Sequence, residues 1–170
     1  MRARQIIAMF VLVAIGLPVA QSHAKLPKAK SKAIVVNKSI GGVKIGAKLK
    51  TVKKKWGKSQ GCGAKYTFGC DWRGSLTQGS AGIVHLGGKV RSLNIRLGLD
   101  STNQVVFSSP LMKFRTNKGI GLGSSEAEVR AAYPTAVNTA ADVLTFGTPG
   151  KVRTLFSIYA GRVNEISIAK

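Results

Sequence analysis

The chain has 170 residues, of which 27 are Lys or Arg and 6 are Asp or Glu, so its formal net charge at pH 7 is +21. Hydrophobic residues make up 44% of the chain, which is enough for one packed domain and untypical of a disordered chain. Two cysteines are too few for a disulfide-dense scaffold or for a zinc site with four cysteine ligands.

The first residues, 1–24, have the pattern of a secretory signal peptide. Arg2 and Arg4 give a positive start, an apolar run of about 15 residues follows, and Ser22 and Ala24 fit a cleavage site. Spanning a bilayer takes about 20 residues, which is longer than this apolar run. A retained membrane anchor is the alternative interpretation. We expect cleavage after Ala24, which lowers the net charge to +19 by removing two arginines, and a secreted or periplasmic chain without a membrane span.

Positive charge is concentrated at the start of the expected mature chain. Residues 25–65 contain thirteen lysines and neither Asp nor Glu, and all six acids lie at Asp71 or later. Residues 25–33 lack a periodic apolar pattern, and we interpret them as a flexible basic arm.

A helix is predicted between residues 47 and 57. Leu49, Val52 and Trp56 are spaced at i, i+3 and i+7, which places them on one helical face, and Gly57 ends the pattern. Lysines surround this apolar face, and so many ammonium groups attract polyanions. They form the candidate anion-binding set: Lys48, Lys50, Lys53, Lys54, Lys55 and Lys58.

Cys62 and Cys70 are expected to form a structural disulfide. Export brings them into an oxidising compartment, and a bridge across so short a loop stabilises the fold by about 2.5 kcal/mol on the chain-entropy model. The alternative is a metal or nucleophilic pair. A metal site would lack ligands, because His85 is the one histidine of the expected mature chain.

The pattern around the first helix recurs later in the chain. The segment GVKIG at 42–46 and the helix after it match GIGLG at 119–123 and a second helix, and residues 88–95 match 161–168. In the second helix Ser125 and Glu128 have capping-box spacing, and Val129 and Tyr133 continue an apolar stripe. Three short strands follow each helix: 66–70, 82–86 and 90–95 in one copy, and 143–146, 152–159 and 163–168 in the other.

These patterns predict an α+β fold of two tandem repeats, each a helical segment followed by an antiparallel β-meander, sharing one sheet. The expected boundaries are a signal peptide at 1–24, the basic arm at 25–33, repeat 1 at 34–99, a joint at 100–110 and repeat 2 at 111–170.

The segments GVKIGAKLKTVKKKWG and GIGLGSSEAEVRAAYP resemble the repeat of β-lactamase inhibitor proteins and of the related small outer-membrane-assembly lipoproteins. The resemblance implies tandem helix-plus-meander units, a disulfide near each helix, and inhibition of an enzyme. The sequence departs from it because it has a single cysteine pair and no Cys directly after the signal. The inhibitors present acidic and aromatic residues to their enzyme, whereas this chain is strongly basic. No contact residue can therefore be transferred.

The sequence gives little sign of catalysis. The acids form no paired-carboxylate motif, no G-x-S-x-G elbow occurs, and the glycines at 119–123 have neither P-loop nor dinucleotide spacing. We predict no catalytic, cofactor-binding or metal residue, and a protein that is not an enzyme.

The remaining hypothesis is a secreted basic binding module. Its expected partners are an anionic envelope polymer, lipid headgroups or an acidic protein, rather than a specific nucleic acid, since recognised nucleic-acid motifs are absent. Two alternatives stay open: the charge serves solubility alone, or the protein inhibits a secreted enzyme.

Overall fold

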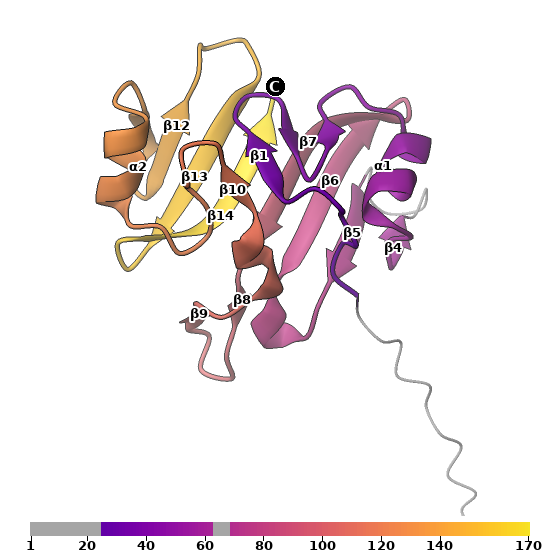
Figure 1. Cartoon of the computed structure of the whole chain (residues 1–170), viewed down its shortest axis with the longest axis horizontal. Coiled ribbons are helices and arrows are strands. Elements are labelled where there is room, and N and C mark those ends of the chain that lie inside the picture. Colours follow the sequence, from indigo (N-terminus) through magenta and orange to yellow (C-terminus); the bar gives the residue numbers. More distant parts are fainter. Residues whose placement is uncertain (1–24, 63–68) are drawn as a thin grey trace, which may run out of the picture.

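An eight-stranded antiparallel sheet dominates the computed structural model, which describes residues 25–62 and 69–170; the expected signal peptide at 1–24 lies outside the described residues. The strand order is β11-β12-β13-β14-β7-β6-β5-β4 (Figure 1). The strands are β4 (Gly61–Cys62), β5 (Gly69–Arg73), β6 (Ser80–Leu86), β7 (Lys89–Arg96), β11 (Val137–Ala140), β12 (Val143–Phe146), β13 (Arg153–Tyr159) and β14 (Arg162–Ala169).

The centre of this sheet is held by the pairing of β7 with β14. Leu93 lies opposite Ile168 and Ile95 opposite Ile166, and all four side chains are buried. Because side chains alternate between the two faces of a strand, these residues share the face that packs into the core. Their neighbours Asn94 and Glu165 therefore belong to the other face.

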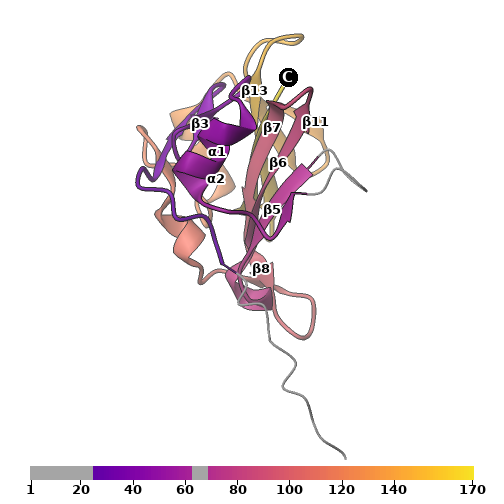
Figure 2. The same cartoon turned by 90° about the vertical axis from the view of Figure 1, so that its right-hand side faces the viewer.

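Shorter elements cover one face of the large sheet. A four-stranded sheet has the order β10-β1-β2-β3, in which β1 and β10 pair in parallel, and β8 and β9 form a separate ribbon. The elements are β1 (Ala33–Val35), β2 (Ser39–Ile40), β3 (Val43–Lys44), β8 (Gly98–Leu99), β9 (Val105–Val106), β10 (Arg115–Thr116), the 3-10 turns η1 (Leu76–Gln78) and η2 (Pro110–Lys113), and the helices α1 (Leu49–Trp56) and α2 (Glu126–Ala132). Figure 2 shows α1, α2 and β3 on one side of the large sheet, whose opposite face carries no helix of the described residues.

Aromatic contacts anchor both helices to the sheet. Trp56 of α1 is 1% exposed and meets Trp72 of β5 edge-on, with ring centroids 5.2 Å apart. Tyr133, at the end of α2, stacks on Phe156 at 5.7 Å and contacts Phe146 at 4.8 Å. Such aromatic pairs add about 0.5–1.5 kcal/mol beyond the apolar area that they bury. The two helices are thus fixed over opposite halves of one sheet (Figure 1).

The helices differ at their N-termini. α2 begins with a capping box, in which the Glu128 N–H donates to Ser125 Oγ (3.2 Å) and the Ser125 N–H donates to Glu128 Oε2 (2.7 Å). The Ser125 N–H and the Ser125 hydroxyl both donate to Glu128 Oε2, and these two bonds lower the pKa of the Glu128 carboxyl below its ordinary value. α1 begins at Lys48, whose side chain makes no capping bond. The capping box predicted from Ser125 and Glu128 is confirmed.

The predicted fold class is wrong. The described residues are 44% strand and 16% helix, with two short α-helices and large antiparallel sheets, rather than an α+β fold of two helix-plus-meander repeats. Extra strands of two or three residues precede α1 (β1, β2 and β3) and lie between β7 and α2 in the chain (β8, β9 and β10). Strands this short cannot display an alternating pattern, whereas two amphipathic helices of eight and seven residues are conspicuous.

The expected basic arm, residues 25–33, contacts α1. The Lys28 N–H donates to the Trp56 carbonyl oxygen (3.0 Å), and Ala29 is buried. Lys32 Nζ lies 4.7 Å from the centre of the Phe114 ring, and burial, together with the nearby charge of Lys113, lowers the Lys32 pKa. Part of the arm is therefore packed against the core.

Candidate anion-binding surface

The six predicted lysines form one exposed surface around α1, here called the lysine face. Val52 and Trp56 are buried against the sheet and Leu49 is half-buried, so the remaining sides of the short helix point outward. All six side chains are exposed: Lys48, Lys50, Lys53, Lys54, Lys55 and Lys58. Each ammonium group carries three hydrogen-bond donors and one positive charge, which suits phosphate, carboxylate or sulfate oxygens.

Ion pairing within the described residues leaves the lysine face uncompensated. The two salt bridges found there join Arg73 to Asp71 (3.1 Å) and Arg130 to Glu126 (2.6 Å), and neither involves the lysine face. Asp71 lies on the neighbouring strand β5, where it is the register partner of Gly61 and its carboxylate is bonded to Arg73. The lysine face therefore presents a positive potential to solvent.

Other lysines extend this positive surface on both sides. Lys25 and Lys28 line an open cleft of about 670 Å³ together with Lys58. At the opposite end of α1, Lys48 forms an isolated antiparallel bridge with Lys89 of β7. The positive surface thus runs from the N-terminal segment across α1 to the β6–β7 hairpin.

An open cleft of about 460 Å³ lies between α1 and strands β4 and β5. Apolar atoms of Leu49, Val52 and Trp72 line it. Lys50 and Lys53, together with Lys58 just beyond the helix, also line it, so half of the lysine face surrounds an apolar cleft. The sequence could not place this cleft, because its walls come from elements that the helical pattern does not connect.

The predicted disulfide is confirmed and forms one wall of the same cleft. Cys62 and Cys70 are bonded and are register partners on β4 and β5, with Cα atoms 4.2 Å apart. Cys70 is buried against the core, whereas Cys62 is exposed. The bridge therefore ties the edge strand β4 to the sheet beside the lysine face.

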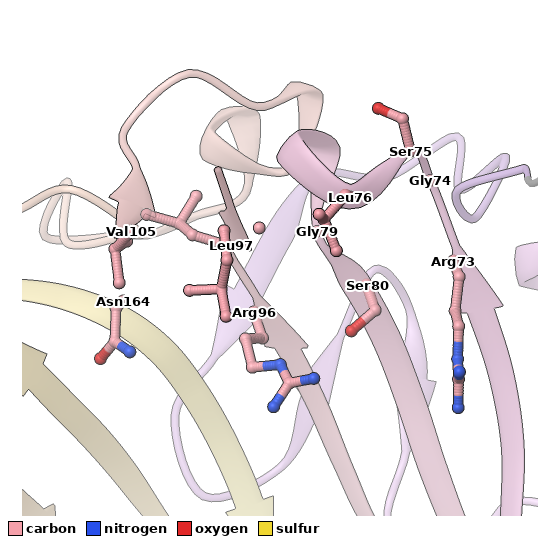
Figure 3. A pocket seen from close by; sticks show the side chains of 12 residues that line it. Arg73, Gly74, Ser75, Leu76, Gly79, Ser80, Arg96, Leu97, Val105 and Asn164 are labelled. Carbon is pink, nitrogen blue, oxygen red and sulfur yellow. The ribbon is translucent and has the colours of Figure 1, made fainter. Parts of the chain in front are cut away.

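A second cavity, of about 430 Å³, lies where the ends of β5, β6 and β7 meet η1 and β8 (Figure 3). Arg73, Ser80 and Arg96 stand in one row across these strands, as their register requires. Leu76 and Val105 form an apolar wall beside them. Asp71 already neutralises Arg73, so this cavity carries less free positive charge than the lysine face.

The two arginines of this cavity are 23 positions apart, and sequence analysis did not identify them as a pair. The pairing of β5 with β6 and of β6 with β7 brings them to the same row. The two arginines could therefore have been identified as neighbours only if the strand register had been known.

Titratable groups that could hold a metal ion or carry out acid–base chemistry are scattered. Across residues 25–62 and 69–170, no three His, Cys, Asp or Glu side chains gather into a possible metal site. His85 of β6 is half-buried.

Across residues 25–62 and 69–170, no helix has the length and apolar character needed to cross a membrane.

Comparisons with known proteins give weak structural similarity. No protein-family model matches the chain, and no curated protein matches it. A DUF4309 family protein from Bacillus subtilis is 11% identical with a TM-score of 0.47, over 77% of this chain and 84% of that chain.

Two further solved structures are similar at a lower level. An extracellular protein containing an SCP domain from Bacillus anthracis is 11% identical with a TM-score of 0.38, over 74% of this chain and 44% of that chain. A cysteine-rich secretory protein from Staphylococcus aureus is 12% identical with a TM-score of 0.38, over 87% of this chain and 49% of that chain. The chain spans less than half of each of these two proteins. Similarity at these scores establishes neither a shared fold nor a shared function.

Proposed function

We propose that this protein is an exported, non-enzymatic module that binds anionic envelope surfaces through the lysine face. The observation that carries the proposal is the exposure of all six lysines around one short helix, with neither salt bridge of the described residues reaching them. Export rests on the signal pattern of residues 1–24, and the disulfide is consistent with an oxidising compartment.

The strength of such binding follows from simple electrostatics. Each lysine close to an anionic membrane contributes about 1 kcal/mol, and the attraction fades within a Debye length of about 10 Å at 0.1 M salt. Six lysines on one surface therefore hold the protein at low salt and release it as salt rises.

The position of two lysines supports a binding role. Lys48 and Lys50 lie at the N-terminal end of α1, where the helix dipole is positive and a cation is unfavourable by roughly 0.3–1 kcal/mol. Lys53, Lys54 and Lys55 lie in the last turn, where the dipole favours them. Helix stability alone would favour an acid or a capping residue at the first positions, as in α2.

A triple substitution tests the proposal. Replacing Lys53, Lys54 and Lys55 by Gln removes three charges from the lysine face, and we expect about five-fold weaker binding per lysine to vesicles of phosphatidylglycerol or to cell-wall fragments. Cosedimentation measures the bound fraction, and circular dichroism checks the fold.

The matched control removes the same charge elsewhere. Lys113, Lys151 and Lys170 are exposed and lie outside α1, so their replacement by Gln lowers the net charge equally. We expect this control to bind nearly as the wild type does. Equal losses in the two triple variants would mean that net charge, and not the lysine face, governs the interaction.

The second function suggested by the sequence, inhibition of a secreted enzyme, depends on the resemblance to β-lactamase inhibitors. The acidic residues that would favour it are few, and five of the six accept hydrogen bonds within the protein: Asp71, Asp100, Glu126, Glu128 and Glu165. Anionic-surface binding is therefore the function that the site supports best.

A further inference from the structure

The cleft beside α1 combines two properties that a purely electrostatic surface does not need. Its floor is apolar, formed by Leu49, Val52 and Trp72, and its volume of about 460 Å³ is within the range of small-molecule sites. Three members of the lysine face, Lys50, Lys53 and Lys58, also line it.

The positive charge of the residues that line the cleft favours a negatively charged ligand. Eleven residues line the cleft, and none of them is Asp or Glu. A neutral or cationic guest would leave the three ammonium groups uncompensated, whereas a phosphate or carboxylate at the rim would accept hydrogen bonds from them.

The apolar floor distinguishes among anions. A hydrophilic polyanion has no apolar part that would displace water from the half-buried Leu49 side chain in this cleft. An acyl chain would, since removing apolar surface from water is favourable on both sides of the contact. Anions that carry such a chain are amphiphiles, and in a cell envelope they are the acidic membrane lipids.

We propose that this cleft binds an acyl chain of an anionic phospholipid, whose headgroup is held by Lys50, Lys53 and Lys58. The inference rests on the proposed function and names the ligand of that surface. The lysine face then has two parts: these rim lysines contact one lipid, while Lys48, Lys54 and Lys55 contact the surrounding membrane surface.

The tryptophans provide a direct readout of this site. The protein contains two, Trp56 and Trp72. Trp72 lines the cleft, and the ring of Trp56 is 5.2 Å from that of Trp72. Tryptophan emission therefore reports on the cleft without labelling, and bromine atoms on an acyl chain quench it on contact.

The experiment compares vesicles of phosphatidylglycerol with brominated acyl chains and vesicles of the same lipid without bromine. Cosedimentation first sets equal bound fractions. We expect lower tryptophan emission on the brominated vesicles, because a chain in the cleft reaches Trp72. Equal emission on the two vesicles would overturn the inference while leaving surface binding intact, and absence of binding to either vesicle at low salt would overturn the proposed function as well.

Two triple variants of equal charge separate the cleft from the surrounding surface. The K50Q/K53Q/K58Q variant should lose the quenching at matched bound fraction. The K48Q/K54Q/K55Q variant, which removes three charges from the rest of the lysine face, should keep it. Equal quenching in both variants would show that the cleft lysines have no special role.

A change in the cleft floor keeps every lysine. Leu49→Gln should lower the quenching while preserving salt-sensitive binding, because Leu49 is half-buried and lines the cleft. Circular dichroism checks that this variant is folded, and where it is not, the pair of lysine variants decides the question. Unchanged quenching in a folded Leu49→Gln variant would contradict the inference.

Discussion

Lys48 and Ser125 occupy the same N-cap position in the two helices, and their comparison shows that a lysine at this position lowers helix stability. Each is the residue before the first helical turn, and each has an extended backbone, with φ −71° and ψ 149° at Lys48 and φ −69° and ψ 157° at Ser125. Ser125 caps α2 through its hydroxyl group, while Lys48 leaves the first N–H groups of α1 without a side-chain acceptor. The sequence therefore places a cation where a capping residue would stabilise the helix.

Replacing Lys48 by Ser should stabilise the protein. The new hydroxyl can accept a bond from the first turn of α1, and a charge leaves the positive end of the helix dipole, so we expect a gain of about 1 kcal/mol in unfolding free energy. Urea denaturation followed by circular dichroism measures it. The reciprocal change, Ser125→Ala, should cost about 1 kcal/mol. A loss of stability in Lys48→Ser would mean that α1 does not begin at this residue.

At the scale of elements, α1 is fixed by its buried stripe rather than by its ends. Trp56 has an exposed fraction of 1% and packs on Trp72, and Val52 beside it is also 1% exposed. A helix of eight residues is too short to be stable alone in water, so packing of this stripe maintains the helix that displays the lysines.

Trp56→Ala should therefore reduce the stability by about 3–5 kcal/mol, because removal of a large buried side chain leaves a cavity. Chemical denaturation gives the free energy, and the bound fraction on anionic vesicles should fall under conditions in which the variant unfolds. Leu76→Ala is a suitable control, since Leu76 is 69% exposed. A change near zero in Trp56→Ala would contradict the packing described for α1.

Local patterns in the sequence predicted particular elements better than they predicted the fold class. The stripe of Val52 and Trp56, the capping box of Ser125 and Glu128, and the Cys62–Cys70 bridge depend on residues close together in the chain, and all are present. The repeat pattern did not give the fold class, because β1 pairs with β10 across about 80 residues through strands too short to show alternation.

One part of the candidate site was likewise predictable from the sequence, and the other parts were not. Helical periodicity placed the six lysines on the outside of α1. The cleft could not be predicted, since it depends on how Trp72 of β5 and the disulfide approach Leu49 of α1. The row of Arg73, Ser80 and Arg96 likewise exists only through strand register.

At the scale of the whole molecule, charge is distributed unevenly around the large sheet. The lysine face belongs to the side that carries the helices (Figure 2), and residues 25–62 contain no acid. Two of the six acids, Asp71 and Glu165, lie on the helix-free face, by alternation with the buried Trp72 and Ile166. Glu126 and Glu128 belong to α2 on the helix-bearing side, so an anionic surface would be met by the half of that side that carries α1.

The salt dependence of wild-type binding to phosphatidylglycerol vesicles tests this account most directly. The screening length falls from about 30 Å at 0.01 M salt to about 3 Å at 1 M, so binding through the lysine face should be strong at the low end and lost at the high end. Neutral phosphatidylcholine vesicles should bind little protein at either concentration. Failure of the wild type to bind phosphatidylglycerol vesicles at low salt would contradict the proposed function, and the positive charge would then serve solubility alone.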